Sequence, residues 1–210
     1  MKNINKTLKN RWFKFFKRIN GQGNSNKIFN EIIKRYSEPH RFYHTLNHIN
    51  DCLKEFDKVK DLCKNPNEVE FAIWFHDIIY NSGEKNNEEK SADFAYKLAK
   101  NIKLLDKFAK DIKQLILATK HNSTPKKNDA RFIVDIDLSS FAKPWKILKE
   151  DNKKIKKEYS FIKNKKFKIG RSVLLESFSI RSNIFLTDYF KEKYERKARE
   201  NIKRFLKELT

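Results

Sequence analysis

The sequence predicts an all-α protein of one domain, covering residues 1–210. Only 4 glycines and 4 prolines occur in 210 residues, and both residue types mark turns, so their scarcity favours long helices. Apolar residues recur every three or four positions, which is the spacing of one helix face. Hydrophobic residues make up 39% of the chain, with 18 phenylalanines, which is enough to fill one core.

Capping signals and spacing predict the N-terminal elements. Residues 1–22 are expected to form a basic amphipathic helix that ends at Gly21, and Asn24 or Ser25 caps a second helix that reaches about Tyr36. After a loop with a proline, a third helix carries both His44 and His48. The fourth begins near Glu68 and runs through His76 to Ile79; because its last turn is nearly all apolar, we expect it at the centre of the core.

Polar loops separate the later elements. These are, in order, a loop at 81–86, a helix at 87–103, a helix at 106–121, a loop at 122–128, a segment at 130–141 that is apolar on both faces, and two or three helices in 143–210.

The net charge of +21 and the pI near 9.8 leave two interpretations open. Lysines displace counterions from phosphate backbones, so nucleic acid is one possible partner. On that hypothesis the basic N-terminal helix would contact the nucleic acid, and a deletion test of binding would begin with Trp12, Phe13 and Lys14. The other interpretation is compositional drift, because Lys, Asn, Ile and Phe all have A/T-rich codons and the lysines are spread along the chain.

Cysteine usage and hydropathy predict a cytoplasmic protein without a membrane segment. Cys52 and Cys63 are the only cysteines and form no CxxC pair, which favours a reducing compartment. No run of about 18 apolar residues occurs, and the N-terminal region has no apolar stretch of signal-peptide length.

Histidines and acids form the candidate site. His44 and His48 are four residues apart, so on one helix they would share a face. His76 and Asp77 are adjacent, and both reach one ion only where the helix is distorted or the ion lies beside it. Imidazole and carboxylate together suit Zn, Fe, Mn, Co or Ni without choosing among them.

Asp135 and Asp137 lie in the apolar run 132–138. A buried carboxylate is costly unless it is paired or bound to a metal. A metal is one such partner, and an arginine, a lysine or a helix N-terminus is another.

These residues resemble the HD superfamily of metal-dependent phosphohydrolases, which is all-helical and binds metal through His, His-Asp and Asp in that order. Residues 43–48 (YHTLNH) resemble the YHxxxH element of its cyclic-nucleotide phosphodiesterase branch, in which the first His is an acid and the second a ligand. Residues 137–145 are similar to that branch's last metal-binding region.

The overall pattern is also similar to a bacterial group of predicted HD hydrolases of about this length. The similarity spans roughly residues 36–202. Its elements are RxYH at 41–44, WFHD at 74–77, NExxSA at 87–92, DxDL at 135–138 and AREN at 198–201.

Carried over residue by residue, the resemblance implies an HD-type helical bundle with its metal-site core at 36–142 and further helices at 143–210. The cofactor would be a divalent metal ion (Mn, Fe, Co, Ni, Zn or Mg). The implied ligands are His48, His76, Asp77 and Asp137. His44 becomes an acid or base; a hydrogen bond to a ligand, or an exchange of roles with His48, stays open.

Five further residues each have a functional and a structural interpretation. His121 would handle protons, bind phosphate or hold a second metal, or it would cap a helix C-terminus. Glu88 would activate water, or it would stabilise its helix N-terminus. Arg41, Lys120 and Arg171 would bind substrate phosphate, or they would be solvated surface cations.

The predicted function is hydrolysis of a phosphomonoester or phosphodiester, and nucleotides are the commonest substrates in the superfamily. The alternatives are a basic nucleic-acid-binding or regulatory protein on an HD fold, and an HD fold in which the metal is only structural.

Overall fold

The computed structural model describes residues 2–209, which contain helices and turns but no strand, so the predicted all-α class is confirmed. One hydrophobic core links residues from Leu8 to Phe205, as in a single domain. No helix in this range is long and apolar enough to cross a membrane. The elements are α1 (Lys2–Arg18), α2 (Ser25–Tyr36), α3 (Leu46–Val59), η1 (Lys60–Leu62), α4 (Pro66–Phe75), α5 (Asn87–Asn101), α6 (Asp106–Ala118), α7 (Asn128–Leu138), η2 (Ser139–Ala142), α8 (Trp145–Glu158), α9 (Asn164–Ser179) and α10 (Asp188–Leu209).

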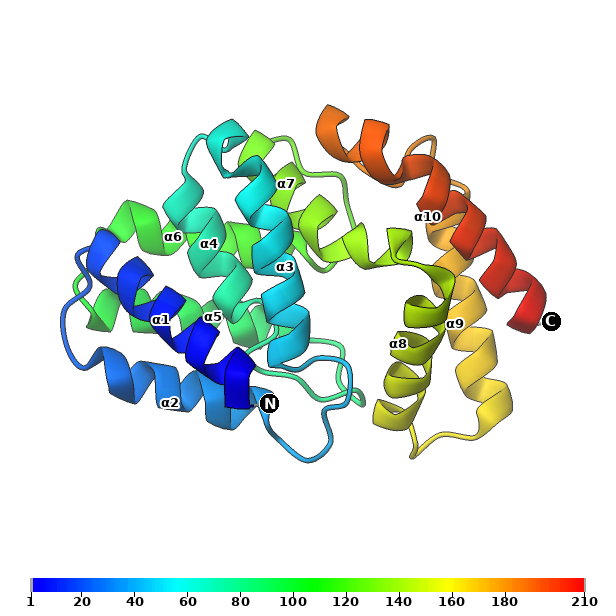
Figure 1. Cartoon of the computed structure of the whole chain (residues 1–210), viewed down its shortest axis with the longest axis horizontal. Helices are drawn as coiled ribbons and strands as arrows, with labels where there is room; N and C mark the ends of the chain where they lie inside the picture. The colour runs from blue at the N-terminus through cyan, green and yellow to red at the C-terminus, as the bar shows by residue number, and fades with distance from the viewer. Residues whose placement is uncertain (1, 210) are drawn as a thin grey trace.

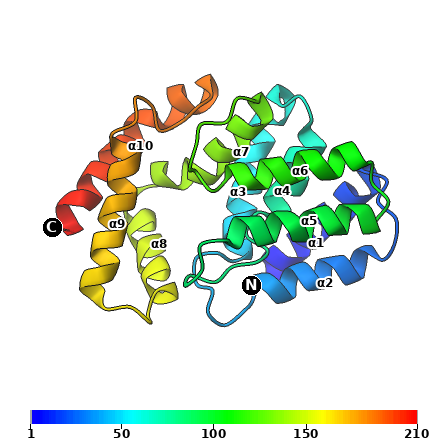
Figure 2. The ribbon, with the colours of Figure 1, turned by 180° about the vertical axis from the view of Figure 1, so that it is seen from behind.

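The helices form two groups, seen from opposite sides in Figures 1 and 2. Helices α1–α7 make the larger group, and α8–α10 stand beside it after η2. Helix α4 contacts α3, α5, α6 and α7, and its residues from Val69 to Phe75 are buried. The predicted central position of this helix is therefore confirmed, and its C-terminal end delivers the next residues into the interior.

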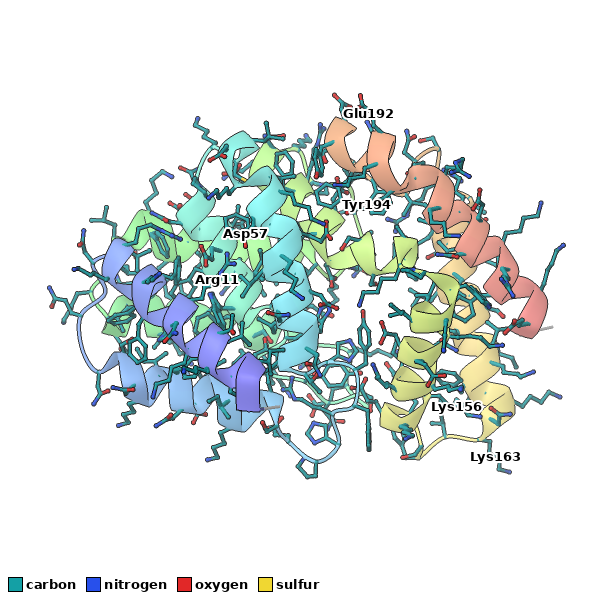
Figure 3. The ribbon with its side chains drawn as sticks, in the orientation of Figure 1. Arg11, Asp57, Lys156, Lys163, Glu192 and Tyr194 are labelled. Carbon is teal, nitrogen blue, oxygen red and sulfur yellow. The ribbon has the colours of Figure 1, made fainter. Side chains whose placement is uncertain are left out.

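Helix α1 directs Trp12 and Arg11 toward the rest of the protein. Trp12 is fully buried and packs edge-on against Trp74 of α4, with ring centroids 5.5 Å apart. Arg11 pairs with Asp57 of α3 at 2.7 Å and with the buried Glu70 of α4 at 2.8 Å (Figure 3). Because Trp12 is a core residue, it cannot stack on a nucleobase, and deleting this helix would open the core.

Two buried polar contacts hold the C-terminal helices to the end of α7. The amide of Asn201 in α10 donates to the carbonyls of Phe141 and Lys143 at 2.7 and 3.0 Å. Asp135 of α7 is fully buried and accepts from the backbone N–H and the hydroxyl of Thr187, both at 2.7 Å. The sequence analysis offered a metal or a protein group as the partner of Asp135. The structure shows that its partners are protein donors.

The predicted helix ends were wrong in three places that matter for the site. Helix α4 ends at Phe75, just before the His-Asp pair that it was predicted to carry. Helix α6 ends at Ala118, and His121 lies beyond it with a left-handed φ of 58°. His44 precedes α3, because the hydroxyl of Thr45 accepts from the backbone in the first turn of α3 and caps that helix.

Candidate metal centre

His76 and Asp77 follow the end of α4, where the backbone leaves the helix. His76 is 3% exposed, and its Nδ1 donates to the carbonyl of Ile73 at 2.9 Å. A ring nitrogen that donates to a carbonyl carries the proton, so the lone pair of the neutral ring is on Nε2. That Nε2 lies 3.2 Å from Oδ2 of Asp77. Two adjacent residues can reach one ion only where the helix is distorted, and the end of α4 at Phe75 provides that distortion for His76 and Asp77.

His48 and Asp137 complete the cluster from two other helices. Nε2 of His48, in the first turn of α3, lies 3.1 Å from Nε2 of His76 and 3.5 Å from Oδ2 of Asp77. Oδ1 of Asp137, from the last turn of α7, lies 3.2 Å from the same nitrogen of His48. The four ligands implied by the resemblance are therefore brought together.

The spacing of these atoms fits a transition-metal ion. Bonds of about 2.0–2.1 Å in a tetrahedral site place neighbouring ligand atoms about 3.3 Å apart. The measured separations run from 3.1 Å, between the two imidazole nitrogens, to 3.8 Å, between Nε2 of His76 and Oδ1 of Asp137. Two imidazole nitrogens at 3.1 Å need a proton or a cation between them, so the donor set fits a bound divalent metal.

Cys52 belongs to the same cluster and was missed as a site residue. It lies one turn after His48 on α3, with Sγ 3.7 Å from Nε2 of that ring. Ligand atoms of His48, Cys52, His76 and Asp137 all lie within 4.8 Å of one another. The signal was present in the sequence, because residues four apart share a helix face. A thiol among the donors favours Zn, Fe or Co over Mg.

The two cysteines allow a matched test of this thiol. We expect Cys52→Ser to weaken binding of Zn²⁺ or Co²⁺ about 10- to 100-fold, as loss of a supporting group at a metal site does. Cys63 is also buried, but its Sγ donates to the carbonyl of Val59, so Cys63→Ser should leave metal affinity unchanged. Competition titration and the cobalt absorption spectrum measure both. Equal affinities for the two variants would contradict a role for Cys52.

The pKa shifts of the cluster show how closely its imidazoles and carboxylates interact. Burial alone would lower the pKa of His76, yet the carboxylates of Asp77 and Asp137 raise it to about 9. Burial alone would raise the pKa of Asp77, yet the imidazoles of His76, His44 and His48 hold it well below its usual range. Burial would likewise raise the pKa of Asp137, but hydrogen bonds from His121 and His48 outweigh it and lower that pKa, so both carboxylates are ionised at neutral pH and available to a metal.

His44 is held beside the cluster by Glu158, the last residue of α8. Its Nδ1 lies 2.7 Å from Oε2 of Glu158, and its ring stacks on Tyr80 at 4.0 Å. Burial would lower the pKa of His44, but the hydrogen bond to Glu158 and nearby carboxylates raise it. The other ring nitrogen, Nε2, takes no part in this hydrogen bond. Sequence reasoning missed Glu158 because it lies far from His44 in the chain.

A cavity of about 520 Å³ lies in front of the cluster. His48 and His76 are buried behind its wall. The predicted site residues that line it are His44, Asp77, Glu88, Lys120, His121, Asp137 and Arg171.

Among the cations that line the cavity, which are Lys85, Lys120, Lys166 and Arg171, the two predicted site residues differ in how well they are neutralised. Lys120 is ion-paired with Glu89. Arg171 of α9 donates through Nε to Oδ1 of Asn152 at 3.0 Å and has no carboxylate partner among the described residues. Burial lowers the pKa of Arg171 from its ordinary value, but a guanidinium stays charged. Arg171 is therefore available to an anion.

Glu88 and His121 lie on the cavity wall. Burial and the charge of Asp77 raise the pKa of Glu88. Nε2 of His121 lies 2.9 Å from Oδ2 of Asp137, whereas its buried Nδ1 has no partner in the described part of the chain. The side chain of His121 is thus oriented by a candidate ligand rather than by the carbonyls at the end of α6.

The structure does not bring Arg41 to the cavity. Its side chain is buried, and its guanidinium donates to the carbonyls of Asp77 and Ile78 at 2.6 and 3.0 Å and to Glu38 at 3.0 Å. Arg41 therefore holds the backbone that carries Asp77, which is a positioning role.

No protein-family model, curated protein or solved structure matches this chain. Membership of the HD superfamily thus stays a prediction, based on the motifs and their order. The arrangement of His48, Cys52, His76 and Asp137 as possible metal ligands does not depend on that membership.

Proposed function

We propose that the protein is an HD-type metal-dependent phosphohydrolase that cleaves a phosphomonoester or phosphodiester. The observation that carries this proposal is that the buried His/Asp cluster and Arg171, a cation without a carboxylate partner, meet at one cavity. A metal on one side and a guanidinium on the other suit the negative charge of a phosphoryl group.

The metal would be held by His48, His76, Asp77 and Asp137, and the thiol of Cys52 lies close enough to be a further ligand. When bound, it would supply Lewis-acid polarisation of phosphoryl oxygens and would acidify water.

The chain's own side chains divide the remaining work. His44 holds a proton on a ring fixed by Glu158 and would give it to the leaving oxygen through Nε2. Arg171 binds the phosphoryl oxygens and offsets their charge, and Lys120 adds charge at the cavity wall.

Two further groups are candidates for a single proton transfer. Glu88, with its raised pKa, would accept the proton of the attacking water. His121, which is hydrogen-bonded to Asp137, is the alternative acceptor of that same proton.

Metal removal and reloading test the proposal. The protein is stripped with a chelator, reloaded separately with Mn²⁺, Co²⁺, Ni²⁺, Zn²⁺ or Mg²⁺, and assayed on phosphomonoesters, phosphodiesters and nucleotides. We expect no phosphate release from the stripped protein and recovery with at least one transition metal, with elemental analysis showing bound metal. Bound metal without phosphate release from any substrate would contradict the proposal.

A further inference from the structure

The cavity has two chemically different ends. At one end are the polar side chains of the candidate metal centre. The other end is formed by α8 and α9, which stand side by side in Figures 1 and 2. The apolar side chains at this end come from α8 (Leu148 and Ile155), from the loop after it (Ile162) and from α9 (Phe167, Leu174 and Phe178). We call this end the apolar slot.

Most hydrogen-bonding groups of the apolar slot are already engaged by the protein. The hydroxyl of Tyr159 is hydrogen-bonded to Tyr80, and Lys166 is an exposed cation of the lining. Oδ1 of Asn152 already accepts from Arg171, and the carboxylate of Asp151 accepts from two lysines at 3.1 and 2.8 Å. Leu174 is 43% exposed although it faces a cavity. A sugar or nucleobase would lose hydrogen bonds to water there, whereas a hydrocarbon would lose none.

Gly170 keeps the slot open beside Arg171. It lies in the interior of α9, where glycine is unfavourable relative to alanine, and it lines the cavity. A Cβ built at this position would meet no heavy atom within 4 Å. Packing therefore does not require glycine here, and a side chain added at this cavity-lining position would enter open space.

We propose that the substrate of this phosphohydrolase carries its phosphate on an apolar alcohol, whose hydrocarbon part lies in the apolar slot while Arg171 binds the phosphoryl oxygens. This proposal rests on the proposed function. The slot is continuous with the metal centre through one cavity, so a single molecule reaches both ends.

Binding of alkylphosphonates tests the slot independently of hydrolysis. The probes are methyl-, butyl-, hexyl- and octylphosphonate, titrated by calorimetry into the metal-loaded protein below their micelle concentrations. We expect the dissociation constant to fall about two- to fourfold per added methylene, as the transfer free energy of a buried CH₂ group predicts. Adenosine monophosphate is the polar comparison and should bind more weakly than octylphosphonate.

Gly170→Leu should remove the dependence on chain length while methylphosphonate binding is kept. The helix tolerates leucine better than glycine, so this variant should fold. Val173→Leu is the control, because Val173 is exposed on the same helix and does not line the cavity. It should retain the full dependence.

The outcomes separate the two proposals. Affinity that does not change with chain length, or that changes equally in Gly170→Leu, would overturn the apolar slot, as would tighter binding of adenosine monophosphate. Binding that increases with chain length without hydrolysis of any alkyl phosphate would support the slot and contradict the proposed function.

Discussion

Asp137→Ala is expected to lose the metal and at least about 10³-fold in kcat/KM while the protein stays folded. Oδ1 of Asp137 lies 3.2 Å from Nε2 of His48 and 3.8 Å from Nε2 of His76, the two nitrogens that would bind the ion. Lewis-acid stabilisation by a metal contributes several kcal/mol to the barrier, and each 1.36 kcal/mol is a factor of ten in rate. Elemental analysis and hydrolysis rates measure the two losses, and circular dichroism checks the fold.

Asp135→Ala is the matched control on the same helix, and the opposite result is expected. Asp135 accepts hydrogen bonds from Leu186 and Thr187 at 2.7–2.8 Å. Removing a buried acceptor from three donors should lower the free energy of unfolding by about 3 kcal/mol. Metal content per folded protein should not change. Metal retained in Asp137→Ala, or lost from folded Asp135→Ala, would contradict the ligand assignment.

Glu158→Gln should lower the free energy of unfolding by about 2–3 kcal/mol and disturb His44. Oε1 of Glu158 accepts from the backbone N–H groups of Phe42, Tyr43 and His44 at 2.7–3.0 Å, and Oε2 accepts from Tyr80 at 3.0 Å. Glutamine keeps the size but replaces one oxygen with a donor, so part of this set is left unpaired.

The pH dependence of that loss has a definite sign in the metal-free protein. Burial would raise the pKa of Glu158, but the hydrogen bond from His44 lowers it from 4.5 to about 2. Its contribution is therefore present above about pH 4.5 and lost as the pH falls toward 2. The pKa of His44 is raised above 6.5, so its contribution is present below about pH 6.5 and lost as the pH rises through the raised value.

The stability difference between the parent protein and Glu158→Gln should therefore be largest between about pH 4.5 and 6.5. Urea unfolding at a series of pH values measures it. Glu150→Gln, at an exposed position of α8, should show almost no difference. A loss for Glu158→Gln that is constant from acid to alkaline pH would argue against the charged pair.

Local chemistry made much of the metal centre predictable. The apolar run of α4 indicated a buried helix, and the cost of burying a carboxylate pointed to special partners for Asp135 and Asp137. The burial argument left open which of these aspartates faces the cluster, and the resemblance implied Asp137. The structure distinguishes them, because Asp135 lies against the backbone before α10 whereas Asp137 lies beside His48.

Long-range pairing was not predictable. Glu158 is 114 residues from His44, and nothing in its local sequence marks it as a partner. Helix ends were a second weakness, because the cap at Thr45 and the end of α4 depend on tertiary contacts as well as on propensity. Cys52 was a different case: its spacing from His48 is visible in the sequence, but two isolated cysteines match neither a disulfide framework nor a CxxC zinc motif.

The position of Glu158 at the end of α8 has a consequence for how such a site can diversify. All of the candidate ligands lie between residues 48 and 137, whereas Glu158, Gly170 and Arg171 come from α8 and α9. Replacements in these two helices would change which molecule is accepted and how the proton donor is oriented without touching the ion. The candidate metal ligands and the lining of the apolar slot are thus encoded in separate stretches of the chain, so under the proposed function the slot can be redesigned while the ligand set is kept.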